Sequence, residues 1–149
     1  MASVSDLLHY KDSAGTAQLV TIAPSATVLE ATKLMNACHI GSVLVRSENG
    51  ALAGILTERD LLTRVLAAEC DPKTTSVGAV MTTGVVTCSP STSIDELKMT
   101  FRERHIRHIP VCAADGQLCG MVSIGDVNAW DHESLEATVN SLTDYITRA

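Results

Sequence analysis

The heptapeptides GILTERD at Gly54–Asp60 and GMVSIGD at Gly120–Asp126 are two versions of one motif. Each version has a glycine, an apolar pair, a hydroxyl residue and a final aspartate at matched positions. A shift of 66 residues aligns residues 21–60 with residues 87–126 without a gap, and eleven of these forty positions are identical. Ungapped agreement of this length indicates a duplicated unit.

The same order of elements is predicted in both repeats. A short strand leads into APSAT or SPSTS, where a serine or threonine can cap the following helix. A β-branched run, a turn with a glycine and a second strand then form a hairpin. The predicted strands lie at residues 19–22, 41–45 and 52–56 in the first repeat and at residues 85–88, 108–112 and 118–122 in the second. The aspartate of the motif opens another helix, at residues 61–68 or from residue 127 onward.

Each repeat is therefore a β-α-β-β-α unit, which is too small to bury its own sheet well. We expect the two repeats to pack face to face about a pseudo-twofold axis, in a fold of the α/β (α+β) class with a C-terminal helix. The predicted domains are residues 13–68 and 77–133, joined by a linker at 69–76 and followed by the C-terminal helix at 134–149.

The C-terminal helix carries an apolar stripe. Leu135, Val139, Leu142 and Ile146 follow one another at intervals of four, three and four residues. Packing of this stripe on its own module is favoured over a coiled coil with another subunit, because coiled coils normally sustain the pattern for three or more heptads.

Composition excludes several classes of protein. The 149 residues are 46% hydrophobic, which suits a globular chain and excludes a disordered one. No apolar run is long enough to span a membrane, and the N-terminus lacks a signal-peptide core, so a cytoplasmic protein is predicted. The net charge of −6 and the scattered basic residues argue against nucleic acid as a partner.

Metal binding and catalysis find little support in the sequence. The five cysteines contain no Cys-x-x-Cys pair, which favours thiols in a reducing compartment over disulfides or a zinc site. His105 and His108 have the spacing His-x-x-His, but a metal would need further ligands. No P-loop or nucleophile elbow is present, and the adjacent Cys38 and His39 are more often structural than catalytic. We therefore expect no metal and no enzyme activity.

Further repeated segments extend the pattern. HIGSVLV at 39–45 and HIRHIPV at 105–111 precede the hairpins, and VGAVMT at 77–82 leads into the second repeat. With the two motifs and their doubled spacing, these segments resemble a tandem pair of CBS domains, the regulatory module named after cystathionine β-synthase. The resemblance covers nearly the whole chain and is greatest to small stand-alone CBS-pair proteins.

The resemblance implies an adenosyl ligand in the cleft between the repeats, with AMP, ADP or ATP favoured over NAD(H) or S-adenosylmethionine, and no other cofactor. The family's Gly-h-x-Ser/Thr-x-x-Asp segment grips ribose and phosphate, and it maps onto Gly54, Thr57 and Asp60 and onto Gly120, Ser123 and Asp126. The expected ligand-binding residues are Thr21, Ile22, Gly41, Ser42, Val43, Ile55, Thr57, Arg59, Asp60, Thr87, Arg107, His108, Ile109, Pro110, Met121, Val122, Ser123, Gly125 and Asp126.

Residue chemistry agrees with this assignment. A carboxylate can accept hydrogen bonds from both ribose hydroxyls, and a serine or threonine can donate to a phosphate oxygen. The N-terminus of the helix that begins at the motif favours the same anion. The alternative is that each aspartate merely caps its helix and each hydroxyl closes the turn. Capping and ligand contact can coexist.

The two motifs are unequal. The first carries Glu58 and Arg59, so a guanidinium is offered to phosphate beside an opposing carboxylate, whereas the second carries Ile124 and Gly125. Asp126 is therefore expected to be the more dependable ribose ligand.

The strand before the second motif also differs from its counterpart. Arg107 and His108 stand where the first repeat has Gly41 and Ser42. The resemblance places this position beside ligand phosphates, and the alternative is a solvated arginine next to a histidine at the strand edge.

The predicted function is a non-enzymatic sensor that binds an adenine nucleotide and transmits the change to a partner protein. The alternative is a ligand-free interaction or scaffold module that dimerises and recruits a partner. A homodimer is expected because the outer helices carry apolar residues, including Trp130, that need cover.

Overall fold

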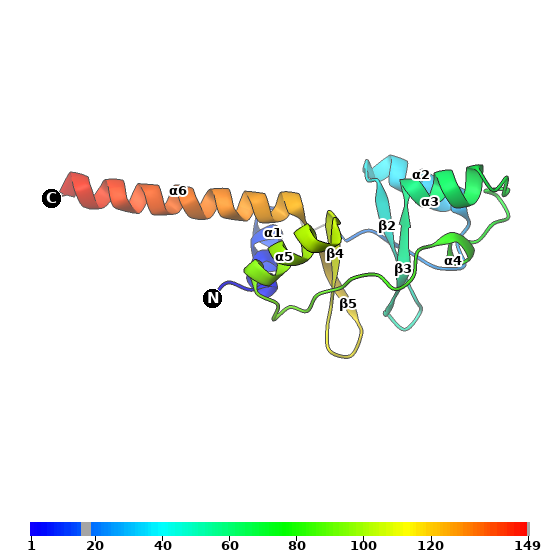
Figure 1. Cartoon of the computed structure of the whole chain (residues 1–149), viewed down its shortest axis with the longest axis horizontal. Coiled ribbons are helices and arrows are strands. Elements are labelled where there is room, and N and C mark those ends of the chain that lie inside the picture. Colours follow the sequence, from blue (N-terminus) through cyan, green and yellow to red (C-terminus); the bar gives the residue numbers. More distant parts are fainter. Residues whose placement is uncertain (16–18, 149) are drawn as a thin grey trace. The chain divides into compact units, whose positions relative to one another are not determined.

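The sheet of the first repeat consists of β1 (Thr21–Ile22), β2 (Ser42–Arg46) and β3 (Leu52–Thr57), and the apolar middle of β2 is completely buried. The structure is a computed structural model that describes residues 1–15 and 19–148. β2 is central, parallel to β1 and antiparallel to β3. Figure 1 shows β2 and β3 side by side. Val43 pairs with Leu56, and both side chains are completely buried. The strands predicted here are confirmed, although β1 is shorter than expected.

The helical segments around this sheet are α2 (Val28–Cys38), α3 (Glu58–Asp60), the π-helical η1 (Leu61–Leu66) and α4 (Val77–Val80). Thr27 caps α2 as predicted, because its hydroxyl oxygen accepts the Glu30 N–H at 3.1 Å. The Glu30 carboxylate accepts the Thr27 N–H at 2.8 Å, which completes a capping box. Apolar residues of β2, β3, α2, η1 and α4 form one buried cluster.

The elements of the second repeat and its surroundings are α1 (Val4–Ser13), α5 (Ile94–Arg104), β4 (His108–Cys112), β5 (Leu118–Ser123) and α6 (Ile124–Arg148). Ser93 caps α5 as predicted, by accepting the Glu96 N–H at 3.2 Å. α1 was not predicted from the sequence, yet Val4 and Leu7 are completely buried in the cluster formed with α5, β4, β5 and α6. α1 is therefore part of the hydrophobic core.

The chain divides into two compact units. Unit 1 comprises Met1–Gln18, Cys88–Val111 and Gly120–Ala149. Unit 2 comprises Leu19–Thr87 and Cys112–Cys119, so it contains the tip of the β4–β5 hairpin. Within unit 2, Gln117 Nε2 donates to the Asn49 carbonyl at 2.7 Å, and the Leu118 N–H donates to the Gly50 carbonyl at 3.2 Å.

The segments before the two repeats, which begin near Val4 and Val77 and are called lead-ins here, make equivalent hydrogen bonds within their own units. The Val77 N–H donates to the Ala26 carbonyl at 2.8 Å, and the Val4 N–H donates to the Thr92 carbonyl at 2.8 Å. Ala26 and Thr92 are equivalent in the duplication. Each repeat thus packs against the lead-in that precedes the other repeat in the chain, which is why α1 belongs to unit 1.

Two predicted boundaries in the motif region were wrong. The helices begin at Glu58 and Ile124, three residues earlier than expected, so the hydroxyl residue rather than the aspartate stands at the helix start. The strand expected at residues 85–88 is reduced to a single bridge between Cys88 and Val111, because the backbone from residue 83 to residue 87 pairs with no strand.

The prediction that the C-terminal stripe packs on its own module was also wrong. α6 is one continuous helix from Ile124 (Figure 1), and its stripe residues are between 57% and 72% exposed. Trp130, expected to need cover, is half-buried against the unit 1 core and meets Tyr10 of α1 edge to face. α1 therefore provides the cover that the sequence analysis assigned to another subunit.

Candidate functional site

Ser123 and Asp126 form a capping box at the start of α6. The Ser123 N–H donates to Asp126 Oδ2 at 2.8 Å, and the Asp126 N–H donates to Ser123 Oγ at 3.1 Å. This reciprocal pair holds the turn between β5 and α6 in a fixed conformation. The capping alternative is therefore realised, and it leaves both side chains half-buried beside the N-terminus of a long helix.

Lys11 of α1 reaches the same carboxylate. Its Nζ donates to Asp126 Oδ2 at 2.8 Å and to the Met121 carbonyl at 2.7 Å. The two side chains are 11% and 19% exposed, so the ion pair is shielded from solvent. Within the described chain, the hydrogen bonds to the Asp126 carboxylate go to Oδ2, which leaves Oδ1 as the accessible acceptor.

His108 lies in the field of this ion pair. Partial desolvation lowers the pKa of His108, the Asp126 carboxylate opposes that change, and the Lys11 and Arg107 cations add to it. The His108 imidazole is therefore neutral at pH 7. Arg107 itself is exposed at the start of β4, and its carbonyl accepts the Ile124 N–H at 3.0 Å.

The first motif forms the same turn with different partners. Asp60 Oδ2 accepts the Thr57 N–H at 3.0 Å and the Thr57 hydroxyl at 3.1 Å. Asp60 Oδ1 accepts the Thr82 hydroxyl at 3.0 Å and lies 3.7 Å from Arg64 Nε. Asp60 is thus 6% exposed, and both of its carboxylate oxygens accept hydrogen bonds from the protein.

Thr82 and Lys11 are not aligned in the sequence, but they bond equivalent groups in the two units. The Thr82 N–H donates to the Ile55 carbonyl at 2.8 Å, whereas Lys11 donates to Met121, the equivalent of Ile55. Thr82 also bonds the motif aspartate of its unit, as Lys11 does in the other. A neutral hydroxyl in unit 2 is thus replaced by a cation in unit 1.

The Glu58 side chain lies over Gly41. A Cβ atom added to Gly41 would approach Glu58 Cδ to 3.3 Å and Oε2 to 3.4 Å. Glu58 and Arg59 are both exposed, and no ion pair joins them in the part of the chain that the structure describes. The carboxylate that was expected to oppose phosphate therefore lies beside Gly41, just before the start of β2.

The predicted ligand residues are divided between the units. Those in unit 2 are Thr21, Ile22, Gly41, Ser42, Val43, Ile55, Thr57, Arg59, Asp60 and Thr87. Those in unit 1 are Arg107, His108, Ile109, Pro110, Met121, Val122, Ser123, Gly125 and Asp126. The side chains of Val43, Ile109 and Val122 are completely buried in the cores, so these residues can offer a ligand only their backbone. The roles of the others stay predictions.

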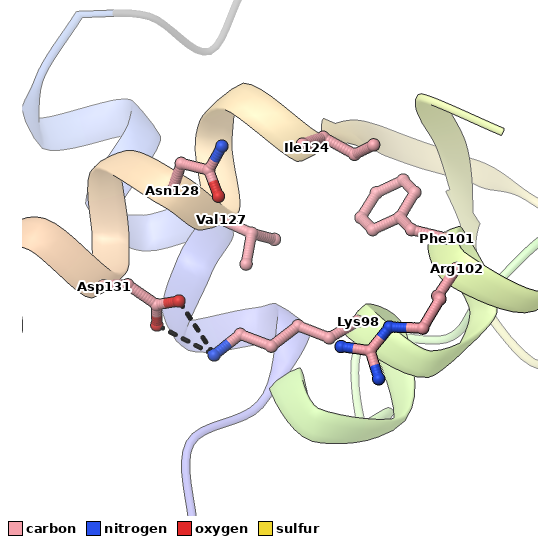
Figure 2. Close-up of a pocket in the computed structure, with 7 residues that line it drawn as sticks. All are labelled: Lys98, Phe101, Arg102, Ile124, Val127, Asn128 and Asp131. Atoms are coloured by element: carbon pink, nitrogen blue, oxygen red, sulfur yellow. Dashed lines mark hydrogen bonds and ion pairs between the residues drawn. The ribbon is translucent and has the colours of Figure 1, made fainter. Parts of the chain in front are cut away.

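A hollow lies between helices in each unit, and each is bordered by a motif residue, Ile124 in unit 1 and Glu58 in unit 2. Figure 2 shows the one in unit 1, of about 310 Å³, where Lys98 and Arg102 of α5 face Asn128 and Asp131 of α6 above an apolar floor. Lys98 Nζ pairs with Asp131 at 2.8 Å. The residues that line the hollow of about 330 Å³ in unit 2 are Thr32, Met35, Asn36, His39, Ile40, Gly41, Glu58 and Leu61.

Sequence reasoning missed Lys11 and Thr82. A signal was present, because Ser3–Val4 and Ser76–Val77 share the same dipeptide at a spacing of 73 residues, outside the register of the main duplication. In residues 1–15 and 19–148, no three His, Cys, Asp or Glu side chains are grouped to hold a metal ion. No helix within the same ranges is long and apolar enough to cross a membrane.

Comparisons with known proteins agree on one family. The CBS domain model matches residues 3–67 and 77–133. The CBS domain-containing protein YhcV of Bacillus subtilis is 32% identical over 145 residues, which cover 96% of each chain. The crystal structure of ATU1752 from Agrobacterium tumefaciens, a CBS-domain containing protein, is 35% identical with a TM-score of 0.71 and covers 87% of this chain and 98% of that chain. The structure of CBSX2 in complex with AMP is 25% identical with a TM-score of 0.75, over 89% and 98% of the two chains.

Proposed function

The chain belongs to the CBS domain family, and we propose that it is a regulatory module that binds an adenine nucleotide, with AMP, ADP or ATP as the preferred ligand. The similarity to CBSX2, whose structure contains AMP, supports this proposal. The single observation that carries it is the duplicated turn, in which a hydroxyl residue and an aspartate are fixed beside a helix N-terminus.

The second motif is the stronger candidate for ribose. Asp126 Oδ1 remains available as an acceptor for a ribose hydroxyl, whereas Asp60 has both oxygens engaged. Ser123 and the first N–H groups of α6 are placed to donate to a phosphate, in the electrostatic field of the helix N-terminus. Arg107 supplies an exposed cation at the start of the neighbouring strand.

A non-catalytic role accompanies this proposal. Stand-alone proteins with CBS domains are typically regulatory rather than catalytic. A nucleotide can regulate such a protein only if it binds two states with different affinity, so a second conformation or a partner protein is required. Turnover of the bound nucleotide would contradict this role.

We also propose a homodimer. Leu135, Val139, Leu142 and Ile146 are exposed along one stripe of α6, and large apolar residues are exposed on η1 as well. In heptad terms the valine and isoleucine occupy a positions and the two leucines occupy d positions, a choice that favours pairing of two helices. This stripe also supports the alternative function, a scaffold module that dimerises without a ligand.

Calorimetric titration with AMP, ATP, NADH and S-adenosylmethionine tests the nucleotide proposal. We expect AMP or ATP to bind with a dissociation constant below 1 mM, and Asp126→Ala to weaken binding by about tenfold, since hydrogen bonds to charged groups contribute about 1.5–3 kcal/mol. If none of the four compounds binds below millimolar concentration while the protein self-associates, the scaffold function is supported instead.

A further inference from the structure

Lys11 is a buried cation that the duplication does not explain. Its side chain is 11% exposed, and it stands on α1, 115 residues away from Asp126 in the chain. A buried ammonium is stable only when it is paired and hydrogen-bonded, and the partners of Lys11 include one carboxylate oxygen and one backbone carbonyl. Its geometry is therefore fixed by the core of unit 1 rather than by solvent.

We propose that Lys11 is a positioning residue of the second motif, which anchors Oδ2 of Asp126 so that Oδ1 accepts a ribose hydroxyl. This inference rests on the proposed nucleotide function. Oδ2 receives the Lys11 ammonium and the Ser123 N–H at 2.8 Å each, and both bonds come from parts of the core that do not rotate with the carboxylate.

The first motif shows the contrasting arrangement. Thr82 bonds Oδ1 of Asp60 while the Thr57 donors occupy Oδ2, so the carboxylate is held through both oxygens. Lys11, in contrast, bonds the oxygen that the capping box already uses. Thr82 therefore engages the second oxygen of Asp60, whereas Lys11 bonds Asp126 without engaging Oδ1. The second motif is expected to distinguish ribose from deoxyribose, and the first is not.

Site-resolved titration tests this role. The 15N-labelled full chain is titrated with AMP, 2′-deoxy-AMP and 3′-deoxy-AMP, and the amide signals of Ser123 and Asp126 report the second motif. We expect AMP to bind there at least about tenfold more tightly than one of the deoxy compounds. Lys11→Met is expected to reduce this ratio to below about threefold.

Lys98→Met is the matched control, because it also removes a lysine that pairs with an aspartate of α6. It is expected to keep the ribose preference of the unmodified chain. A Lys11→Met protein that binds AMP and keeps the full preference overturns the inference. If Lys11→Met does not fold, Lys11→Gln decides: a severalfold loss of preference supports the inference, and an unchanged preference overturns it. Amide signals that stay unmoved by AMP in the unmodified chain would count against the nucleotide function itself, whatever Lys11 does.

Discussion

The ring of Tyr10 meets the ring of Trp130 edge to face, with centroids 5.6 Å apart and an interplanar angle of 82°. Tyr10 belongs to α1 and Trp130 to the second turn of α6, so the contact joins the two ends of the chain within unit 1. Aromatic pairs in this geometry contribute about 0.5–1.5 kcal/mol beyond the area that they bury. The tryptophan, the single one in the chain, is therefore a natural reporter of α1 docking.

Leu7→Ala should lower the free energy of unfolding by about 3 kcal/mol, because Leu7 is completely buried and its truncation leaves a cavity. Urea unfolding followed by Trp130 fluorescence measures the change. Leu66→Ala is the control, since Leu66 is 67% exposed, and it should shift the free energy of unfolding by less than about 0.5 kcal/mol. Equal midpoints for the two variants would contradict the assignment of α1 to the core.

Gly54→Ala should destabilise the protein far more than Gly120→Ala. A Cβ at Gly54 would lie 2.6 Å from the Thr82 carbonyl oxygen, and this backbone is fixed by paired hydrogen bonds to Ile55. At Gly120 the first contact, at 3.0 Å, is the end of the flexible Leu8 side chain. We expect losses of about 2–3 kcal/mol and below about 1 kcal/mol, measured by thermal unfolding. A larger loss for Gly120→Ala would show that the lead-ins pack differently.

Leu142→Glu should convert the proposed homodimer to a monomer without lowering the stability of the fold, because Leu142 is 57% exposed and touches no core cluster of the described residues. Light scattering at tens of micromolar measures the mass. Asn140→Glu adds the same charge to another face of α6 and should remain dimeric. A monomeric unmodified chain at this concentration would refute the dimer.

Stability should fall on acidification from pH 7.5 to pH 5.5, and His108 should contribute to the fall. Desolvation lowers the pKa of His108 in the folded state, so between this lowered value and about 6.5 the unfolded chain binds more protons. The loss in the free energy of unfolding that His108 causes is absent above the pKa of the unfolded state and complete below the pKa of the folded state.

Thermal midpoints of the unmodified chain and of His108→Gln, recorded at both pH values, measure this contribution. The variant should lose less stability on acidification. His132→Gln, on the exposed part of α6, serves as the comparison. If His108→Gln loses as much stability as the unmodified chain, desolvation does not lower the pKa of this imidazole.

The order of elements could be predicted from the sequence because local rules decide it. Thr27 and Ser93 precede the apolar periodicity of their helices, and both are caps. The motif helices were placed three residues late because the aspartate was assigned the cap position, whereas the hydroxyl residue takes it and the aspartate accepts its N–H in return. The same hydroxyl and aspartate residues would be present whichever of the two capped the helix, so the sequence does not show which one takes the cap position.

The partner of a buried side chain could not be predicted in the same way. Lys11 and Asp126 are brought together only by the fold, across 115 residues of sequence. Nothing in the sequence of α1 indicates that this lysine is buried. The spacing of apolar residues in α6 shows that the helix is amphipathic but does not show what covers its apolar stripe. The stripe was predicted to pack on its own module, and it is exposed instead. Asp60 and Asp126 end related motifs, and the sequence does not show that Thr82 bonds the first and Lys11 the second.

Each repeat packs with the segment that precedes the other repeat in the chain, so neither repeat with its own preceding segment is a complete folding unit. A fragment that ends after residue 68 would lose α4, which completes its core, and would keep α1, whose partners belong to the other fragment. Two copies of a half-length chain could still complete both cores if the N-terminal segment of each packed on the other copy. The single chain thus contains an arrangement that two separate half-length chains could also make.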